Sequence, residues 1–441
     1  MSYFEYFNIN FYKQSFVFYN MKKEKIDMKG IFVIIDGVGD LDNKQLKGKT
    51  PLEAANTPNL DFLATRGEMG YMYPIKPGYS PGSDEAIVTL FRNELSDSTR
   101  GRLEAEGAGL KLKKGDLALR VNFGTIDTLE KGNVVDRRAG RTLSNKEANK
   151  LGESINNIEF PYEFEFVPTV QHRAVLVIRG DFSDRIAGDD ITYQKGSSEE
   201  IRKIISCQPL IKTENAKHTA DVLNEFLILA YDVLRNHSVN LDRKRRGLLP
   251  ANYLLVRTPG VKKPKLKQYK DWISTHSMAL EVGFSELSGM KNFPFKYPVL
   301  KGLDAYKNLW AGLKKAVKHS IKILQKNFDK ASYCYVHFKE TDLPGHDNKP
   351  LEKMAMIEYL DKTFFKFLVR SCPQRNIRIL VTGDHSTPCK LKSHSADPVP
   401  VLLYNGKLPQ EKKHFNEREA RKGSLKRILG KDLLQKIGFL K

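Results

Sequence analysis

The chain has 441 residues, of which 40% are hydrophobic and 28% charged, and at about 150 residues per domain this length predicts two or three domains. No stretch approaches the roughly 18 uninterrupted apolar residues of a membrane-spanning helix, so we expect a soluble globular protein with no membrane partner. The 73 Lys and Arg against 52 Asp and Glu give a formal charge of +21, which suits anionic small substrates, nucleic acid or an anionic membrane surface and does not by itself choose among them.

Residues 1–27 precede the first predicted strand, and we interpret them as an N-terminal extension. The segment is rich in Tyr and Phe, and polar residues interrupt it, so it lacks the unbroken apolar stretch of a secretory signal; it also lacks arginine. The cysteines show no CxxC spacing, which fits a reducing compartment; they are Cys207, Cys334, Cys372 and Cys389. We therefore expect a cytoplasmic protein.

The organised part of the chain begins with five consecutive apolar residues, 31–35, directly before Asp36. This pattern is typical of a fully buried parallel strand that delivers a polar side chain at its carboxyl end. Two later runs repeat the arrangement: residues 333–338 lead to Asp342, and residues 377–382 lead to Asp384 and His385.

Further periodic segments complete the predicted core. Apolar residues recur at helical spacing over residues 307–328 and 351–369, and another strand is predicted over 399–404. Strands alternating with helices predict an α/β fold, in which a core sheet is sandwiched by helices.

The stretch from 115 to 212 differs, because short strand-like runs such as 117–123 and 174–178 are separated by polar turns. We interpret it as an inserted, smaller α+β domain. A helix is predicted over 214–235, and we expect it to return the chain to the main sheet. The core would then consist of two parts, residues 28–114 and 213–441.

Oxygen and imidazole side chains gather at the ends of the predicted strands. They are Asp36, Asp342, Asp384 and His385, with His346 and His394 in nearby loops. Each one alone is read more simply as a cap, a turn residue or an ordinary polar histidine. Together they lie at the sheet edge where ligands bind in open α/β folds, which predicts a dinuclear metal site. A mixed oxygen and nitrogen set favours Mn²⁺ or Zn²⁺.

A candidate nucleophile lies in the segment Pro81-Gly82-Ser83-Asp84, directly before a predicted helix over residues 85–91. Ser83 in this position is expected either to cap the helix or to take part in phosphoryl chemistry, because a helix N-terminus also stabilises phosphate. A serine hydroxyl becomes a good nucleophile only when a base or a metal activates it.

Several longer segments extend these observations. They are DGVGD at 36–40, GKTPLEAANTPNL at 48–60, PGSD at 81–84, GNVVDRRAGR at 132–141, KETDLPGHD at 339–347, TGDHSTPC at 382–389 and HSADPVP at 394–400. Together they strongly resemble the archaeal-type 2,3-bisphosphoglycerate-independent phosphoglycerate mutases, which belong to the alkaline phosphatase superfamily. The resemblance covers nearly everything after Met28.

The resemblance implies an alkaline-phosphatase-like core and a division of the metal ligands. One ion would be held by Asp36, Ser83, Asp384 and His385, and the other by Asp342, His346 and His394. Mn²⁺ or Zn²⁺ would occupy the site, with Mg²⁺ or Co²⁺ as further options, and no bisphosphoglycerate would be needed. Ser83 would take the phosphate from 2- or 3-phosphoglycerate and return it, in glycolysis or gluconeogenesis, while the inserted domain excludes water.

Arginines are the expected clamps for the substrate's carboxylate and phosphate, because the guanidinium fork binds such groups bidentately. The leading candidates are Arg137, Arg138 and Arg141, and the weaker ones are Arg100, Arg173 and Arg257. For any one of them, a solvated surface position is the simpler reading. Ile87 and residues 91–95 depart from the family pattern near the substrate pocket.

Alternatives from other functional classes remain open. A metal-dependent phosphatase or another phosphomutase would share the covalent step and differ in the phosphate acceptor. A sulfatase is disfavoured, because the Ser83 segment lacks the Cys/Ser-x-Pro-x-Arg pattern. The positive charge alone suggests nucleic-acid binding, against which the intact ligand set argues. The sequence also leaves homo-oligomer formation open.

Overall fold

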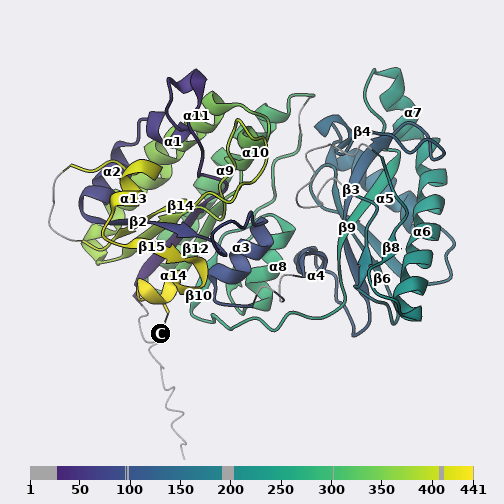
Figure 1. Cartoon of the computed structure of the whole chain (residues 1–441), viewed down its shortest axis with the longest axis horizontal. Helices are drawn as coiled ribbons and strands as arrows, with labels where there is room; N and C mark the ends of the chain where they lie inside the picture. Colours follow the sequence, from purple (N-terminus) through teal and green to yellow (C-terminus); the bar gives the residue numbers. More distant parts are fainter. Residues whose placement is uncertain are drawn as a thin grey trace, which may run out of the picture.

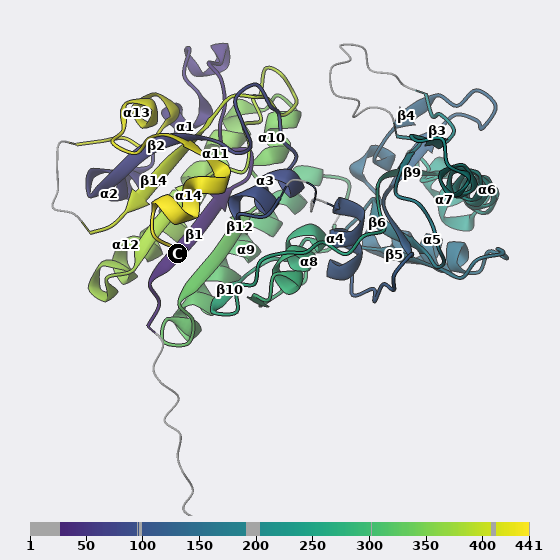
Figure 2. The same cartoon turned by 60° about the horizontal axis from the view of Figure 1, so that its bottom comes forward.

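The computed structural model describes residues 27–94, 96, 99–190, 203–300, 302–406 and 412–440. The predicted extension lies outside these residues, except for Asp27. The described chain forms two bodies, each built on its own sheet, with helices α4 (Arg100–Gly107) and α8 (Ala279–Leu287) between them (Figures 1 and 2). Within the described part, no helix has the length and apolarity that crossing a membrane requires.

The larger body contains an eight-stranded sheet of order β11-β10-β12-β1-β13-β14-β2-β15. Its strands are β1 (Gly30–Ile35), β2 (Gly67–Tyr73), β10 (Trp272–Ser274), β11 (Lys291–Asn292), β12 (Tyr333–Phe338), β13 (Arg378–Thr382), β14 (Val399–Tyr404) and β15 (Lys426–Leu429). Central β1 runs parallel to both β12 and β13, so the carboxyl ends of these three strands share one edge.

Helices cover both faces of this sheet, because the side chains of β1 alternate between two hydrophobic clusters. Val33 and its neighbours at even spacing pack into one, and Phe32 and Ile34 into the other. The first cluster lies under α2 (Pro58–Thr65), α9 (Ala305–Asn327), α11 (Pro350–Leu360) and α12 (Lys366–Ser371), and the second under α3 (Ser83–Leu90), α8 and α14 (Gly430–Lys436). Short helices α1 (Pro51–Ala54), α10 (Asp342–His346) and α13 (Glu417–Lys422) complete the body. The predicted helix-covered α/β sheet is confirmed.

The smaller body is built on an antiparallel sheet in which β9 and β6 flank β3. Its strands are β3 (Leu117–Ile126), β4 (Val134–Asp136), β5 (Phe164–Pro168), β6 (Arg173–Ile178) and β9 (Tyr253–Gly260), and a separate pair is formed by β7 (Ile186–Ala187) and β8 (Gln208–Pro209). Three helices accompany them: α5 (Asn145–Asn156), α6 (Glu214–Arg235) and α7 (Ser238–Arg245).

The structure differs from the sequence prediction in where the smaller body ends. Helix α6 has the predicted bounds, but Leu223 and Phe226 pack into the core of the smaller sheet together with Phe123. The next strand, β9, pairs with β3 of that sheet, so the chain returns to the larger body only after Gly260 instead of after residue 212. The apolar face of an amphipathic helix can be predicted from the sequence, but the sheet that this face covers cannot.

Candidate active site

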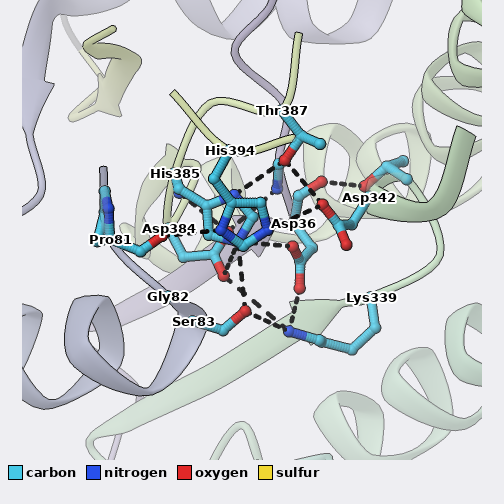
Figure 3. Close-up of polar contacts among 12 residues, drawn as sticks. Asp36, Pro81, Gly82, Ser83, Lys339, Asp342, Asp384, His385, Thr387 and His394 are labelled. Atoms are coloured by element: carbon cyan, nitrogen blue, oxygen red, sulfur yellow. Dashed lines mark hydrogen bonds and ion pairs between the residues drawn. The ribbon is translucent and has the colours of Figure 1, made fainter. Parts of the chain in front are cut away.

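The predicted metal-site residues converge at the shared edge of β12, β1 and β13 (Figure 3). Asp36 directly follows β1, Asp342 begins α10 just after β12, and Asp384 follows β13 by two residues. Ligand atoms of Asp342, His346 and His394 lie within 4.8 Å of one another, and so do those of Asp36, Asp342 and His385. The parallel register therefore brings together residues separated by more than 300 positions in the sequence.

The first group consists of Asp342, His346 and His394. The Nε2 atoms of the two histidines lie 3.3 Å and 3.7 Å from the carboxylate of Asp342. Each Nδ1 faces a backbone carbonyl, that of Lys392 at 3.0 Å from His346 and that of Pro81 at 2.8 Å from His394. Because a carbonyl only accepts hydrogen bonds, each Nδ1 carries the proton, and each Nε2 presents a lone pair.

The second group consists of Asp36, Asp384, His385 and Ser83. Nε2 of His385 lies 3.4 Å from Asp36 Oδ1, 3.3 Å from Asp384 Oδ2 and 3.3 Å from Ser83 Oγ. Both aspartates are fully buried, and burial together with repulsion from Asp384 raises the pKa of Asp36. Two carboxylates buried side by side require compensating cations, which fits a divalent ion at this position.

Thr387 connects the two groups through its hydroxyl, which donates to Asp342 Oδ1 at 2.7 Å. The hydroxyl oxygen of Thr387 also lies 3.0 Å from His385 Nδ1 and accepts a hydrogen bond from it, so Nε2 of His385 presents its lone pair to Ser83. Burial, more than any neighbouring charge, lowers the pKa of His385 to about 3, which keeps the imidazole neutral. Gly37 makes this arrangement possible, since a Cβ there would lie 2.5 Å from Thr387 Oγ1 and its φ of +59° disfavours other residues.

Ser83 is the first residue of α3, and the capping position belongs to Gly82. The expectation that Ser83 caps the helix is therefore wrong, and its hydroxyl faces the cluster instead (Figure 3). The residue is 8% exposed, so its oxygen is partly shielded from water.

Two further residues of the site were missed from the sequence. Lys339 Nζ lies 3.2 Å from Ser83 Oγ and forms an ion pair with Asp36, and His337 Nε2 lies 3.2 Å from Asp36 Oδ2. Burial opposes the charge on Lys339, but Asp36 and Glu281 raise its pKa above the usual value. The alternation of β12 carries a signal that could have revealed His337, because it follows Tyr335 at the spacing of one face of the strand, whereas Lys339 lies just beyond the end of the strand.

Four of the predicted arginines pair with acidic side chains. Arg141 Nη1 lies 2.5 Å from Asp347, directly after His346, and Arg100 Nη1 lies 3.0 Å from Asp84, directly after Ser83. Arg137 and Arg257 share Asp190, and Arg173 lies on β6. Burial opposes the charge on Asp347, but Arg141 first, with Tyr306 and Arg138 adding to it, holds the pKa of Asp347 below its usual value. Arg120, which the sequence reading missed, faces Arg257 across the β3–β9 pair.

Comparisons with known proteins agree with this geometry. A family model described as 2,3-bisphosphoglycerate-independent phosphoglycerate mutase matches residues 64–240. A protein of that name from Thermococcus kodakarensis is 38% identical over 421 residues, which cover 94% of this chain and 96% of the relative. Another from Pyrococcus horikoshii is 39% identical over 419 residues and covers 92% and 95%. This chain belongs to the family of 2,3-bisphosphoglycerate-independent phosphoglycerate mutases.

Solved structures extend the match to the fold of this mutase family. A Pyrococcus horikoshii protein aligns with a TM-score of 0.71 and 31% identity, covering 94% of this chain and 99% of that chain. A cofactor-independent phosphoglycerate mutase from Thermoplasma acidophilum aligns with a TM-score of 0.55 and 29% identity, covering 93% and 99%. Each alignment therefore spans nearly the whole length of this chain and of the solved structure.

Proposed function

We propose that this chain interconverts 3-phosphoglycerate and 2-phosphoglycerate without bisphosphoglycerate, through a phosphoserine at Ser83. The observation that carries the proposal is the position of the Ser83 hydroxyl. It lies at the N-terminus of an eight-residue helix, with the neutral imidazole of His385 at 3.3 Å and the ammonium of Lys339 at 3.2 Å. The helix N-terminus and the ammonium both stabilise the charge of a phosphate attached there.

Two divalent ions belong to the proposal, because the two groups supply carboxylate and imidazole donor atoms of the kind that bind such ions. We assign Asp36, Ser83, Asp384 and His385 to one ion, and Asp342, His346 and His394 to the other. Mn²⁺ and Zn²⁺ suit this set best, and Mg²⁺ and Co²⁺ are further options. Bound ions would neutralise phosphate oxygens and lower the pKa of the Ser83 hydroxyl.

The proposed covalent step needs no reactant other than the chain and its substrate. Ser83 Oγ forms a bond to phosphorus as the bond from phosphorus to the glycerate oxygen breaks, and the proton released from Ser83 balances the one that the glycerate hydroxyl takes up. The glycerate then presents its other hydroxyl, which attacks phosphorus and releases Ser83. The ammonium of Lys339 stabilises the negative charge on the Ser83 oxygen in both steps, because it already contacts Ser83 Oγ.

The smaller body supplies the proposed substrate clamp. Arg141 reaches the larger body in this structure and pairs with Asp347 beside His346. A phosphoglycerate bound between the bodies offers a carboxylate and a phosphate, and such groups bind guanidinium forks in place of an aspartate. We include Arg137, Arg138, Arg100, Arg173 and Arg257 in this clamp, as residues that fix and surround the bound anion.

The decisive experiment follows both possible acceptors of the phosphate. Protein stripped of metal with a chelator is reloaded separately with Mn²⁺, Zn²⁺, Mg²⁺ or Co²⁺ and incubated with 3-phosphoglycerate, without bisphosphoglycerate. Phosphorus NMR should show 2-phosphoglycerate accumulating without free phosphate, and the stripped protein should be inactive. Release of inorganic phosphate without interconversion would instead identify a metal-dependent phosphatase.

The proposed function also bears on the cellular location of the enzyme and on its assembly. Phosphoglycerates are intermediates of cytoplasmic metabolism, so we place the enzyme in the cytoplasm. The proposed site takes all its residues from one chain, so a homo-oligomer is compatible with activity without being required by it. Gel filtration with light scattering measures the assembly directly.

A further inference from the structure

Glu281 is a buried carboxylate next to the candidate active site that none of the roles above uses. It lies on α8 and is 1% exposed. Two basic side chains lie within 4.0 Å of its Oε1, Lys339 with Nζ at 3.1 Å and His337 with Nδ1 at 4.0 Å. Burial alone would raise the pKa of Glu281, but Lys339 and His337 keep it below the ordinary value, so the side chain is an anion. A buried anion is tolerated only when it is paired, which makes Lys339 its main partner.

Lys339 is held from two sides. On one side its ammonium pairs with Asp36 and lies 4.0 Å from Asp384 Oδ2, and both of these belong to the proposed metal ligands. On the other side it pairs with Glu281, which belongs to none of the ligand clusters found in the described part of the chain. Glu281 also borders a small pocket of about 10 Å³, lined by His276 and Glu340 among others, which has room for about one water molecule.

The two sides become unequal once metal ions are present. An ion bound by Asp36 and Asp384 takes up their negative charge and also repels an ammonium group. The attraction that holds Lys339 on that side is therefore lost in the loaded enzyme. Glu281 keeps its full charge, because it is not a ligand.

We infer that Glu281 is a positioning residue that holds the ammonium of Lys339 beside Ser83 Oγ when the metal ions are bound. This inference rests on the proposed function and adds to it a residue from α8, outside the segments that carry the family resemblance. Glu281 acts on the reaction only through Lys339. Its contribution is therefore largest in the metal-loaded enzyme and small in the metal-free protein.

The first test compares Glu281→Gln, which removes the charge at nearly constant shape, with Glu281→Asp, which keeps it. Glu286→Gln on the exposed face of the same helix is the matched control. We expect Glu281→Gln to lower kcat by about 10- to 100-fold, as for other residues that orient a catalytic group, with a much smaller change in KM and an unchanged metal content. Glu281→Asp should recover part of the loss.

The second test reads the position of Lys339 without measuring activity. Reductive methylation followed by peptide mass mapping reports how readily the Lys339 amine reacts. In Glu281→Gln the reaction should accelerate in Mn²⁺-loaded protein and stay near the wild-type rate in metal-free protein, where Asp36 still holds the ammonium. An equal acceleration in both states would mean a general loosening of the structure and would overturn the inference.

A double variant covers the case in which Glu281→Gln alone does not fold. Lys339→Met with Glu281→Gln removes both charges together and should have the same residual kcat as Lys339→Met alone. Additive losses, or wild-type kcat and labelling in Glu281→Gln, would show that Glu281 does not act through Lys339. Failure of the proposed function is distinguishable, because the wild type would then lack mutase activity while the labelling result still stands.

Discussion

Ser83 is the side chain on which the proposed mechanism depends most, and it gives the simplest prediction. Ser83→Ala should fold normally, because Gly82 occupies the capping position and Ser83 does not. Mutase activity should fall by several orders of magnitude, since the variant lacks the hydroxyl that we propose as the phosphate acceptor. Quenching the wild type during turnover and mapping the phosphopeptide by mass spectrometry should find the modification on Ser83.

Ser80→Ala is the control for this prediction, because it removes a hydroxyl three residues away, before the helix begins. It should retain activity. Phosphate on a residue other than Ser83, or substantial turnover by Ser83→Ala, would contradict the covalent mechanism and leave the metal assignment standing.

His394 provides a test of the metal assignment that does not depend on the phosphoserine. Removing its Nε2 leaves Asp342 and His346 as the ligands of that ion, and two protein ligands hold a divalent ion much less tightly than three. We expect His394→Ala to lose one of two ions, as measured by elemental analysis after gel filtration. His414→Ala, at a 56% exposed side chain paired with Asp61, should keep both. Full metal content in His394→Ala would refute the assignment.

Asp189 gives a prediction about stability and pH that is independent of the active site. It is fully buried and accepts a hydrogen bond from Val256, and burial, reinforced by Asp190, raises its pKa well above the usual value. The native state therefore keeps a proton that the unfolded chain loses above about pH 4. Its contribution to the free energy of unfolding is present below that pH and is lost as pH rises through the native pKa.

Asparagine cannot ionise, so Asp189→Asn should remove this pH-dependent loss of stability. The free energies of unfolding of variant and wild type, measured with urea, should therefore diverge as the pH is raised. Asp221→Asn, on the exposed face of α6, removes a charge without removing a buried acid and should parallel the wild type. Parallel profiles for Asp189→Asn would show that the buried carboxyl does not set the slope.

At the scale of helices and strands, sequence pattern identified individual elements better than their partners. The bounds of β12 and α6 agree with the prediction because their apolar spacing is regular and their ends are polar. The strand ends also located Asp36, Asp342 and Asp384, since parallel strands share an edge. The pattern could not assign α6 to a sheet, because packing between distant segments decides that. Lys339 was missed because a lysine next to an acidic segment is indistinguishable from a solvated one.

The loops after β1 and β13 are joined by Lys353, a fully buried lysine on α11. Its ammonium donates to Asp40 at 2.8 Å and to the carbonyl of Thr387 at 3.0 Å. Lys353→Met leaves Asp40 as an unpaired buried charge, which should lower the free energy of unfolding by about 3–5 kcal/mol. The loops that carry Asp36 and His385 also lose the lysine contacts that join them, so metal affinity should fall as well.

Urea unfolding and Mn²⁺ titration of the metal-free protein measure both effects of Lys353→Met. Lys362→Met is the control, because its side chain is 59% exposed and its ion pair with Glu358 lies on the surface. A variant with normal stability would show that Asp40 finds another partner, and a stable variant with normal metal affinity would show that the loops do not need this tie.

For the molecule as a whole, the contact between Arg141 and Asp347 joins the two bodies beside the proposed metal site. The hydroxyl of Tyr306 also donates to Asp347, at 2.9 Å. If Arg141 exchanges Asp347 for the substrate, Arg141→Ala should lose a charge-assisted hydrogen bond of about 1.5–3 kcal/mol, which corresponds to about a 10- to 100-fold loss in kcat/KM. Elemental analysis should still find the full metal content.

Arg245→Ala serves as the control for Arg141→Ala, because its side chain is 78% exposed on α7, away from the contact. It should behave like the wild type. Arg138→Ala should resemble Arg141→Ala in direction. Unchanged kinetics in both variants would move the substrate clamp to another part of the smaller body.

The crossing of α4 and α8 limits how such enzymes can be recombined. Gly107 and Gly283 let the two helices meet backbone to backbone, since a Cβ at either glycine would overlap a carbonyl of the other helix. Gly283 lies two residues after Glu281 on α8, so the helix that seats the smaller body also carries the partner of Lys339. A chimera that exchanges smaller bodies between relatives should therefore take α4 and α8 from the same parent. Dividing the pair between parents would misalign the joint and the catalytic ammonium together.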